Sequence, residues 1–373
     1  MSALLCLPDQ LDTAVLEQLA SARAENLVAR RCSDLAEILG AAAAALASLA
    51  IIDADLPGLD VTAVTRLREM GVAVAVVAGK RPVNEVRALG EVEVLSANPQ
   101  EIIAKLKSAP APSQPVAPAA PQPQGNGKIV AVWGPAGSHG RSVIARDLAA
   151  IGGEVLLIDA DTQAPSLSQL AGLAESSAIV ALARQIEHGK SVTEVFEKAL
   201  QQPGWGGNFL AGLNTGSRWR ELPRPVLDRM WEPLRTCAPY CVVDLAGGWE
   251  KSSGQLDRYA AANSIVEAAD VVLHVAMATP VGLRRLLEHL DTVVVSGAQQ
   301  AILLNRYVPG ALGPDLAAQL RTVFAGVSLP IYLIPEERKL ARAELAGQAA
   351  PKSKYRKELQ LVWQKVCAMV APA

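Results

Sequence analysis

A proline- and alanine-rich segment, residues 109–127, divides the chain. It contains six prolines and no charged residue. Proline lacks an amide donor and favours the extended polyproline II conformation, so a stretch this rich in proline acts as a semi-rigid spacer rather than as a helix or a central strand. We therefore expect two separately folded domains, residues 1–108 and 128–373, joined by this linker.

Both domains alternate short β-branched runs with longer amphipathic runs. This alternation is typical of an α/β fold, in which helices cover a mostly parallel sheet. The order of elements over residues 1–108 fits a five-stranded flavodoxin-like unit. The expected strands are residues 3–7, 46–52, 72–77 and 91–95 in the first domain, and 128–133, 154–158, 240–243, 271–276, 301–305 and 330–333 in the second.

The composition limits the classes of function. Half of the residues are hydrophobic and 19% are charged, which suits a chain with sizeable cores. The formal net charge of −2 argues against a broad basic surface, so we expect no specific nucleic-acid partner. The start of the sequence lacks a basic segment and a cleavage site. The longest uncharged apolar run, residues 38–52, is too short and too rich in alanine to span a bilayer, so we expect a cytoplasmic protein.

Asp53 ends one of the expected strands in the first domain, and Leu-Pro-Gly follows at residues 56–58. In an open α/β sheet the chemistry gathers at the carboxyl ends of the strands, where Asp53 lies. The segment resembles the phosphoacceptor strand of response-regulator receiver domains. That resemblance places Asp53 at the acceptor position.

Other positions depart from the receiver pattern. Receivers hold Mg²⁺ with an acidic pair after the first strand, and this chain has only Asp9 there. Ala78 takes the place of a hydroxyl residue, and Asn98 precedes Pro99 where receivers have lysine. Phosphoryl transfer needs the metal and the cation to offset negative charge. We therefore expect an interaction module in which Asp53 is a vestigial phosphoacceptor; the alternative is a regulator that is phosphorylated on Asp53.

A glycine-rich loop directly follows the first strand of the second domain and precedes a helix. Such a loop can bind phosphates, because its backbone amides point inward and the helix N-terminus adds positive potential. Arginine occupies the position of the usual lysine, and the first glycine comes one residue early. We expect His139 to face solvent. The expected nucleotide-binding residues of the loop are Gly134, Gly137, Ser138, His139, Gly140, Arg141 and Ser142.

Four later segments follow in a fixed order. They are an Asp-x-Asp at the end of a strand, a strand ending in aspartate, a Thr-Pro loop and a strand ending in Asn-Arg. In this order the segments resemble the ParA/MinD superfamily of P-loop ATPases, over nearly all of residues 128–373. The residues that carry the resemblance are Asp159, Asp161, Asp244, Thr279, Pro280, Asn305 and Arg306.

The resemblance implies that ATP or ADP binds together with Mg²⁺. Ser142 would ligate the metal directly, and Asp159 and Asp244 would hold it through water. Asp161 would position the water that attacks the nucleotide. Asn305 would contact adenine, and the adjacent arginine belongs to the same nucleotide-binding segment.

At two positions this chain lacks a lysine that the superfamily has in its phosphate-binding loop. Arg141 stands where the superfamily has the lysine that bridges the β- and γ-phosphates, and a broad planar guanidinium cannot simply replace a compact ammonium. Ala136 stands where the superfamily has a second lysine, which reaches across a dimer. Charge compensation in the transition state is therefore reduced. We expect nucleotide binding with weak or absent hydrolysis.

The whole layout resembles the TadZ/CpaE proteins, which combine a receiver-like domain with a degenerate ParA/MinD domain. These are localisation factors for Flp (tight-adherence) type IV pilus assembly, and septum-site-determining homologues in actinobacteria are similar. The resemblance implies a homodimeric, nucleotide-binding scaffold with pilus-assembly or cell-division partners, at a pole or at the inner face of the membrane. The alternative is a MinD-like ATPase switch in septum placement or partitioning.

The last expected helix, residues 352–370, starts with basic residues and carries an apolar stripe at helical spacing. The MinD branch uses such a helix to bind membranes. Two expectations follow, a helix docked on the sheet and a helix in peripheral contact with the membrane.

Overall fold

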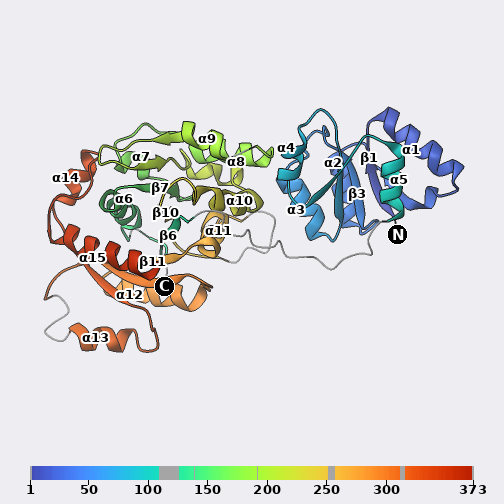
Figure 1. Cartoon of the computed structure of the whole chain (residues 1–373). Coiled ribbons are helices and arrows are strands. Elements are labelled where there is room, and N and C mark those ends of the chain that lie inside the picture. Colours follow the sequence, from blue (N-terminus) through green and yellow to red (C-terminus); the bar gives the residue numbers. More distant parts are fainter. Residues whose placement is uncertain are drawn as a thin grey trace. The chain divides into compact units, whose positions relative to one another are not determined.

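The computed structural model describes residues 2–108, 126–137, 139–190, 192–250, 257–310 and 316–371. The linker predicted at 109–127 falls almost entirely outside these residues, as does Ser138 of the glycine-rich loop. The chain divides into two compact units, Met1–Pro121 with Arg184–Ser191, and Gln122–Ala183 with Val192–Ala373. The elements of both units are labelled in Figure 1.

The first unit contains a five-stranded, fully parallel sheet in the order β2-β1-β3-β4-β5. This is the strand order of flavodoxin-like folds. Helices α1 and α5 pack together, as do α2 and α3. The strands are β1 (Ala3–Cys6), β2 (Val28–Arg31), β3 (Leu49–Asp53), β4 (Ala73–Val77) and β5 (Val92–Leu95), and the helices are α1 (Asp9–Ser21), α2 (Leu35–Ala43), α3 (Val61–Glu69), α4 (Val83–Ala88) and α5 (Pro99–Lys107), with a 3₁₀ turn at Glu25–Leu27.

The second unit contains an eight-stranded sheet in the order β13-β12-β11-β6-β10-β7-β9-β8, in which only the β8–β9 pair is antiparallel. This confirms the expected α/β class with a mostly parallel sheet. The strands are β6 (Lys128–Trp133), β7 (Val155–Ala160), β8 (Leu200–Gln201), β9 (Asn208–Leu210), β10 (Tyr240–Leu245), β11 (Val271–Met277), β12 (Gln299–Tyr307) and β13 (Ile331–Pro335).

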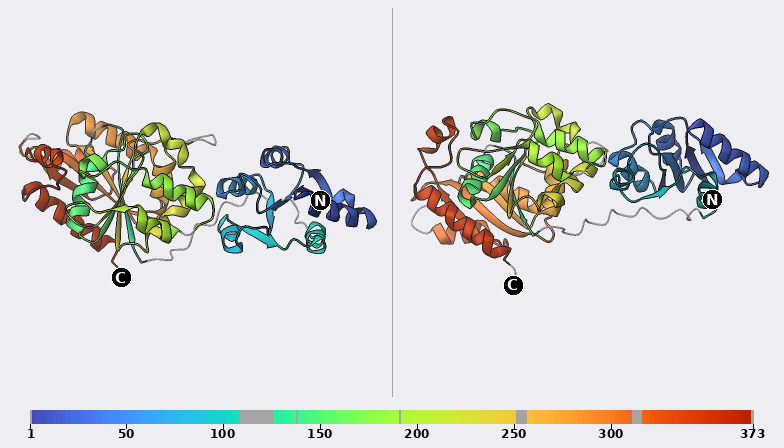
Figure 2. Two further views of the ribbon diagram at one scale, coloured as in Figure 1. Left: turned by 90° about the horizontal axis from the view of Figure 1, so that it is seen from above. Right: turned by 45° about the horizontal axis from the view of Figure 1, so that its top comes forward.

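Helices cover both faces of this sheet (Figure 2). Helices α6 and α15 pack together over one face, and α10 packs on α11 over the other. The helices are α6 (Arg141–Gly152), α7 (Leu167–Leu170), α8 (Ala178–Glu187), α9 (Val192–Ala199), α10 (Arg224–Leu234), α11 (Ala260–Ala268), α12 (Pro280–Thr292), α13 (Leu316–Val323), α14 (Leu340–Leu345) and α15 (Lys354–Met369), with a 3₁₀ turn at Gly216–Glu221.

The topology creates a crevice at the carboxyl end of β6. From β6 the chain crosses through α6 toward β7, whereas from the neighbouring β11 it crosses through α12 toward β12, in the opposite direction. Open α/β sheets bind ligands at such a switch point, outside the carboxyl ends of the strands. The glycine-rich loop follows β6 and therefore lies in this crevice.

Helix α15 is docked on the second unit. It packs on α6 and β13, and the Tyr355 hydroxyl donates a hydrogen bond to Asp147 of α6 at 3.0 Å. This packing buries the apolar stripe, as expected for a docked helix, whereas peripheral contact with a membrane stays an untested prediction. No helix among the described residues combines the length and the apolar character needed to cross a membrane. The buried stripe consists of Tyr355, Leu359, Val362, Trp363 and Val366.

Candidate functional site

The loop between β6 and α6 depends on glycine for its backbone shape. Gly134, Gly137 and Gly140 have φ angles of 153°, 118° and 85°, a region that favours glycine. A Cβ on Gly134 would lie 2.3 Å from the carbonyl oxygen of Val275. A Cβ on Gly140 would lie 2.4 Å from Nδ2 of Asn305. The loop is therefore both sharply turned and closely packed on β11 and β12.

His139 connects this loop to β11 through two hydrogen bonds. The backbone N–H of Met277 donates to Nδ1 of His139 at 3.1 Å, so Nε2 carries the proton and donates to the carbonyl of Ala136, also at 3.1 Å. The imidazole is only 4% exposed, and burial lowers its pKa. The expectation that His139 faces solvent is wrong. A neutral histidine here joins the loop to the end of β11.

Asn305 provides a second connection. Its side-chain amide donates to the carbonyl of His139 at 3.0 Å, and its oxygen accepts the N–H of Arg306 at 2.9 Å. Asn305 is buried and Arg306 is exposed. The sequence led us to expect a contact between Asn305 and adenine, but it did not indicate that this side chain holds the glycine-rich loop in place.

Arg141 lies at the first position of α6 and turns its guanidinium back toward the loop. Nη1 donates to the carbonyls of Pro135 and Gly137 at 2.8 and 3.0 Å. Nε donates to the carbonyl of Leu245, at the end of β10, at 3.3 Å. The guanidinium therefore connects the loop to the neighbouring strand, at the place where a phosphate-binding cation is expected.

Two carboxylates meet at the carboxyl edge of the sheet. Asp244 of β10 is the direct neighbour of Asp159 of β7 in the strand register, and both side chains are buried. Burial is the main cause that raises both pKa values; the charge of Asp161 adds to the rise at both residues, and the charge of Asp159 adds to it at Asp244. The pKa of Asp159 reaches about 7, and that of Asp244 is raised well above its ordinary value. The negative charge of these two carboxylates, when they are ionised, is therefore not fully compensated by the protein.

Asp244 has the features expected of a metal ligand. Neither of its carboxylate oxygens has a partner with full hydrogen-bond geometry among the described residues, and the nearby Ser142 hydroxyl interacts with it without completing such a bond. The hydroxyl of Ser142 and the guanidinium of Arg141 lower its pKa, but less than burial raises it. Oxygen ligands of this kind suit Mg²⁺, so the residues present fit that ion. No group of three histidine, cysteine or acidic side chains in the described part of the chain could hold a metal by itself, so phosphate or water oxygens would have to complete the shell.

Asp159 and Asp161 are more constrained by the backbone. Asp159 accepts N–H groups from Asp161 on one oxygen, and from Ser166 and Leu167 on the other, at 3.0–3.2 Å. One oxygen of Asp161 accepts the N–H groups of Gln163 and the following alanine, both at 2.8 Å. These bonds shape the turn after β7. The structure thus brings Arg141, Ser142, Asp159, Asp161 and Asp244 to one edge, and Asp244 has the freest oxygens.

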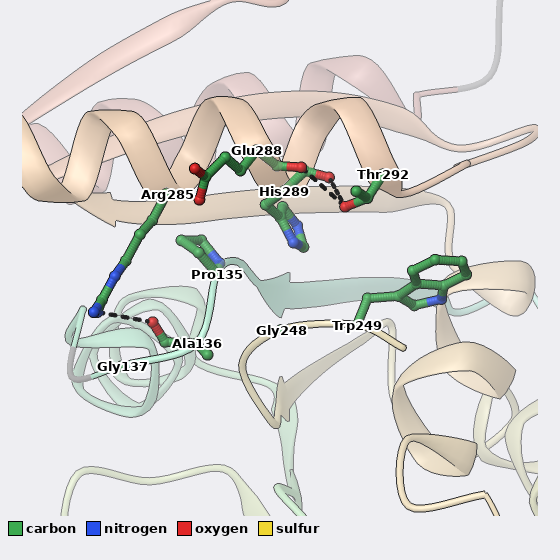
Figure 3. Close-up of a pocket in the computed structure, with 9 residues that line it drawn as sticks. All are labelled: Pro135, Ala136, Gly137, Gly248, Trp249, Arg285, Glu288, His289 and Thr292. Carbon is green, nitrogen blue, oxygen red and sulfur yellow. Dashed lines mark hydrogen bonds between the residues drawn. The ribbon is translucent and has the colours of Figure 1, made fainter. Parts of the chain in front are cut away.

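A cavity of about 580 Å³ opens beside the loop. Figure 3 shows α12 along one side, with Arg285 pointing toward the loop, and Trp249 on the opposite side. Arg285 Nη1 lies 3.4 Å from the carbonyl oxygen of Ala136. The sequence motifs did not indicate that Arg285 of α12 lies beside the loop, because only the folding of the chain brings the two together. The lining residues are Pro135, Ala136, Gly137, Gly248, Trp249, Arg285, Glu288, His289 and Thr292.

Asp53 of the first unit lies in a different setting. It is partly exposed, and burial is the main cause of its raised pKa. Asp55 lies beside it and accepts the backbone N–H groups of Lys80 and Arg81 at 2.8 and 3.2 Å. A Cβ on Gly79 would lie 2.6 Å from a carboxylate oxygen of Asp55. A second carboxylate therefore fills the space over Gly79, next to the predicted vestigial acceptor.

No protein-family model and no curated protein sequence matches this chain. Among solved structures it is similar to the cell division ATPase MinD of Pyrococcus furiosus, with 17% identity, a TM-score of 0.53, and 65% of this chain and 99% of that chain covered. It is also similar to the septum site-determining protein MinD from Pyrococcus horikoshii OT3, complexed with Mg-ADP, with 18% identity, a TM-score of 0.52, and 66% and 99% covered.

A ParA family ATPase from Chlorobium tepidum TLS gives 18% identity, a TM-score of 0.53, and 64% and 98% coverage. At this level of identity, the similarities show the fold. The chain therefore shares a mostly parallel α/β fold with these MinD and ParA family ATPase structures.

Proposed function

We propose that this chain is a nucleotide-binding localisation scaffold of the TadZ/CpaE type, which positions Flp pilus assembly machinery and hydrolyses ATP slowly or not at all. The observation that carries the proposal is the buried carboxylate of Asp244, which has no partner with full hydrogen-bond geometry among the described residues, beside a glycine-shaped loop. A nucleotide with Mg²⁺ would supply both the cation that this carboxylate lacks and the phosphates that the loop amides can bind.

In this proposal each residue has a defined task. The backbone of Gly137–Ser142 binds phosphate, and Arg141 adds positive charge. The hydroxyl of Ser142 ligates Mg²⁺, while Asp244 and Asp159 act on the metal through water. Bound Mg²⁺ would polarise the phosphate oxygens. Asp161 shapes the turn after β7 through two backbone N–H groups.

The proposal assigns 1–108 to an interaction domain, 109–127 to a linker and 128–373 to the nucleotide-binding domain. The two domains together would recruit pilus or cell-division proteins at a pole or at the membrane face. We also propose that the chain forms a homodimer. Its assembly should depend only weakly on nucleotide, because the methyl side chain of Ala136 cannot reach the nucleotide of a second copy.

The test combines binding and turnover. Calorimetry with ATP and ADP, with and without Mg²⁺, should show Mg²⁺-dependent binding, while steady-state phosphate release stays near background. Ser142→Ala should weaken binding, because it removes a metal ligand. Asp161→Ala should leave binding nearly unchanged, although it should cost stability because it removes two hydrogen bonds in the turn after β7. Light scattering of the same samples should show a dimer both with and without ATP.

Two outcomes would contradict this proposal. If no Mg²⁺-dependent nucleotide binding is measured, the chain is not a nucleotide-binding scaffold. Robust turnover that falls on the order of 10²-fold or more in Asp161→Ala would instead indicate a MinD-like ATPase switch, because loss of a positioned catalytic group has that effect. Ser353→Ala, which removes the cap of α15, is the matched control: it should cost about 1 kcal/mol of stability and leave binding unchanged.

A further inference from the structure

Gly247, just after β10, leaves room for the guanidinium of Arg141. A Cβ at this position would lie 2.5 Å from Nη2, 2.6 Å from Cζ and 2.6 Å from Nη1 of Arg141. These are its three nearest atoms, and all belong to that one side chain. The space that any other residue would fill at 247 is therefore the space that the guanidinium occupies.

The backbone does not require glycine at this position. Gly134, Gly137, Gly140 and the neighbouring Gly248 all have φ angles in the positive region, whereas Gly247 does not. An alanine at 247 would therefore not meet the penalty of a positive φ. Glycine at 247 is thus needed to make room for the guanidinium, and not to shape the backbone.

The hydrogen bonds of Arg141 explain why the room matters. Among the described residues they involve Nε, bonded to Leu245, and Nη1, bonded to two carbonyls of the loop. This leaves Nη2 as a donor for an anion. A guanidinium is broad and planar, and it can keep this arrangement only if its outer edge has space beside the strand end.

We propose that Gly247 is a positioning residue that makes Arg141 compatible with phosphate binding. It lets the guanidinium lie back against the end of β10, so that the loop stays open for nucleotide phosphates and Nη2, which no carbonyl of the described residues holds, can donate to them. The inference rests on the proposed function, since it specifies how that site accepts arginine. It also implies that lysine at 141 would not need glycine at 247.

A four-variant cycle tests the coupling: the wild type, Gly247→Ala, Arg141→Lys, and the double variant. Affinity for Mg-ADP and Mg-ATP should fall about tenfold or more in Gly247→Ala, because a charge-assisted hydrogen bond to phosphate is displaced. Arg141→Lys sets the reference for a site without the guanidinium, and adding Gly247→Ala to it should change the affinity by no more than a few-fold. The double variant should therefore stay at the level of Arg141→Lys, which a merely structural role of Gly247 would not produce.

Gly204→Ala is the matched control, because Gly204 also lies outside the positive-φ region and a Cβ there would meet nothing within 4 Å. It should bind like the wild type. Unchanged affinity in Gly247→Ala, or a loss of affinity from Gly247→Ala that is as large in Arg141→Lys as in the wild type, would overturn the inference.

A second readout separates this inference from the proposed function. The NMR signal of the Arg141 Nε–H group, assigned by its loss in Arg141→Lys, should shift in Gly247→Ala and stay in place in Gly204→Ala. If the wild type binds no nucleotide, the proposed function fails, and this inference falls with it whatever the signal does. If the wild type binds but the signal does not move in Gly247→Ala, the inference alone is wrong.

Discussion

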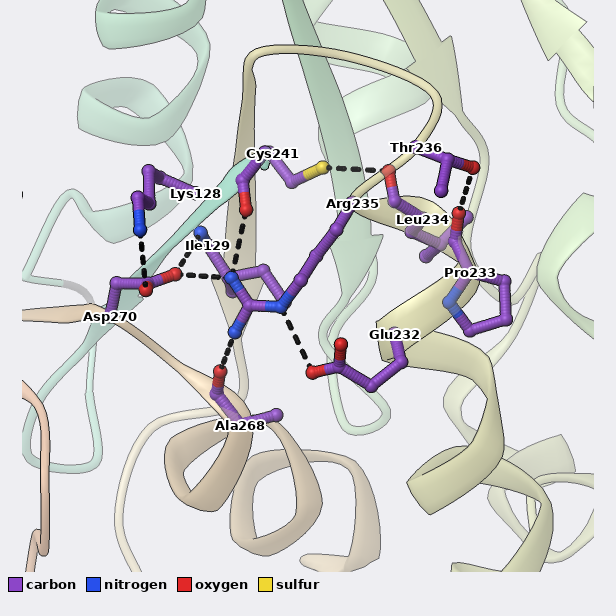
Figure 4. Close-up of polar contacts among 11 residues, drawn as sticks. Lys128, Ile129, Glu232, Pro233, Leu234, Arg235, Thr236, Cys241, Ala268 and Asp270 are labelled. Carbon is purple, nitrogen blue, oxygen red and sulfur yellow. Dashed lines mark hydrogen bonds and ion pairs between the residues drawn. The ribbon is translucent and has the colours of Figure 1, made fainter. Parts of the chain in front are cut away.

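Arg235 and Asp244 are buried charged side chains at the two ends of the second sheet, and they differ in their hydrogen bonding. At the amino end, Arg235 donates from all three of its nitrogens: Nε to Glu232, Nη1 to Asp270 and the carbonyl of Gly127, and Nη2 to the carbonyl of Ala268 (Figure 4). At the carboxyl end, Asp244 has two oxygens that lack a partner with full hydrogen-bond geometry among the described residues.

The surroundings of Asp270 complete the contrast. Its carboxylate also accepts the N–H of Ile129 at 2.8 Å and lies 3.6 Å from Nζ of Lys128. Burial lowers the pKa of Arg235, but the bonds and charges of Asp270 and Glu232 outweigh burial and raise it. Paired charge therefore joins the first strand of this unit to α10. Unpaired charge at the other end costs stability and suits a ligand.

The largest effect is expected at the amino end. Arg235→Ala would leave two acidic side chains and two backbone carbonyls without their donor, and removing one partner of a buried pair costs about 3–5 kcal/mol. Urea unfolding should show this loss, while the folded fraction should bind nucleotide as the wild type does.

Arg284→Ala is the control for this first variant. Arg284 pairs with Glu288 at 3.0 Å, but the two side chains are 80% and 59% exposed, so its loss should cost less than about 0.5 kcal/mol. Equal stability losses in Arg235→Ala and Arg284→Ala would mean that the amino-end network contributes no more than a surface pair.

Part of this contrast could be read from the sequence. Asp159, Asp161, Asp244 and the loop glycines stand at the ends of runs that also predicted most strands. The register that makes Asp244 the neighbour of Asp159 depends on strand order, which residue spacing does not determine. The network around Arg235 depends in the same way on packing between distant segments.

Two misses have physical causes. The expected strands omitted β2 (Val28–Arg31), because its residues are mostly exposed and two are arginines, so no apolar run marks this edge strand. His139 was expected to face solvent, because a loop position gives no sign that a strand end lies beneath it. The pairing of Arg141 with Gly247 was equally hidden, because only the fold brings these two residues together.

The second effect should have the opposite sign. Asp244→Asn removes a buried charge, so we expect it to stabilise the protein at pH 8, on the order of 2 kcal/mol, and to abolish Mg²⁺-dependent nucleotide binding. Asp270→Asn is the same substitution at the amino end, and it should destabilise the protein by about 1–3 kcal/mol because it weakens bonds to Arg235 and Ile129. Chemical unfolding of both variants at pH 8 checks the two signs.

The pH dependence follows from the same carboxylates. The pKa of Asp159 is about 7 in the folded protein, against about 3.9 in an unfolded chain. Between these values the folded state holds more protons, so wild-type stability should fall as pH rises from about 4 to about 7. Asp244→Asn should reduce this slope, because the pKa of Asp244 is itself raised well above its ordinary value in the folded protein and its own contribution to the slope is lost. Destabilisation by Asp244→Asn, or an unchanged slope, would contradict the assignment of unpaired charge to the carboxyl end.

The smallest effect is expected in the first unit, where the acidic side chain next to Asp53 has backbone partners, unlike Asp244. Asp55 accepts two backbone N–H groups beside Asp53. A phosphoryl group on Asp53 would bring a further charge of about −1.5 to −2 next to this carboxylate, with Ala78 and Asn98 in place of a hydroxyl and a cation. Incubation of the full chain with acetyl phosphate and Mg²⁺ should therefore leave its intact mass unchanged. A stoichiometric gain of one phosphoryl group that disappears in Asp53→Asn would show that a partnered edge can still carry chemistry, and the contrast between the two kinds of edge would fail there.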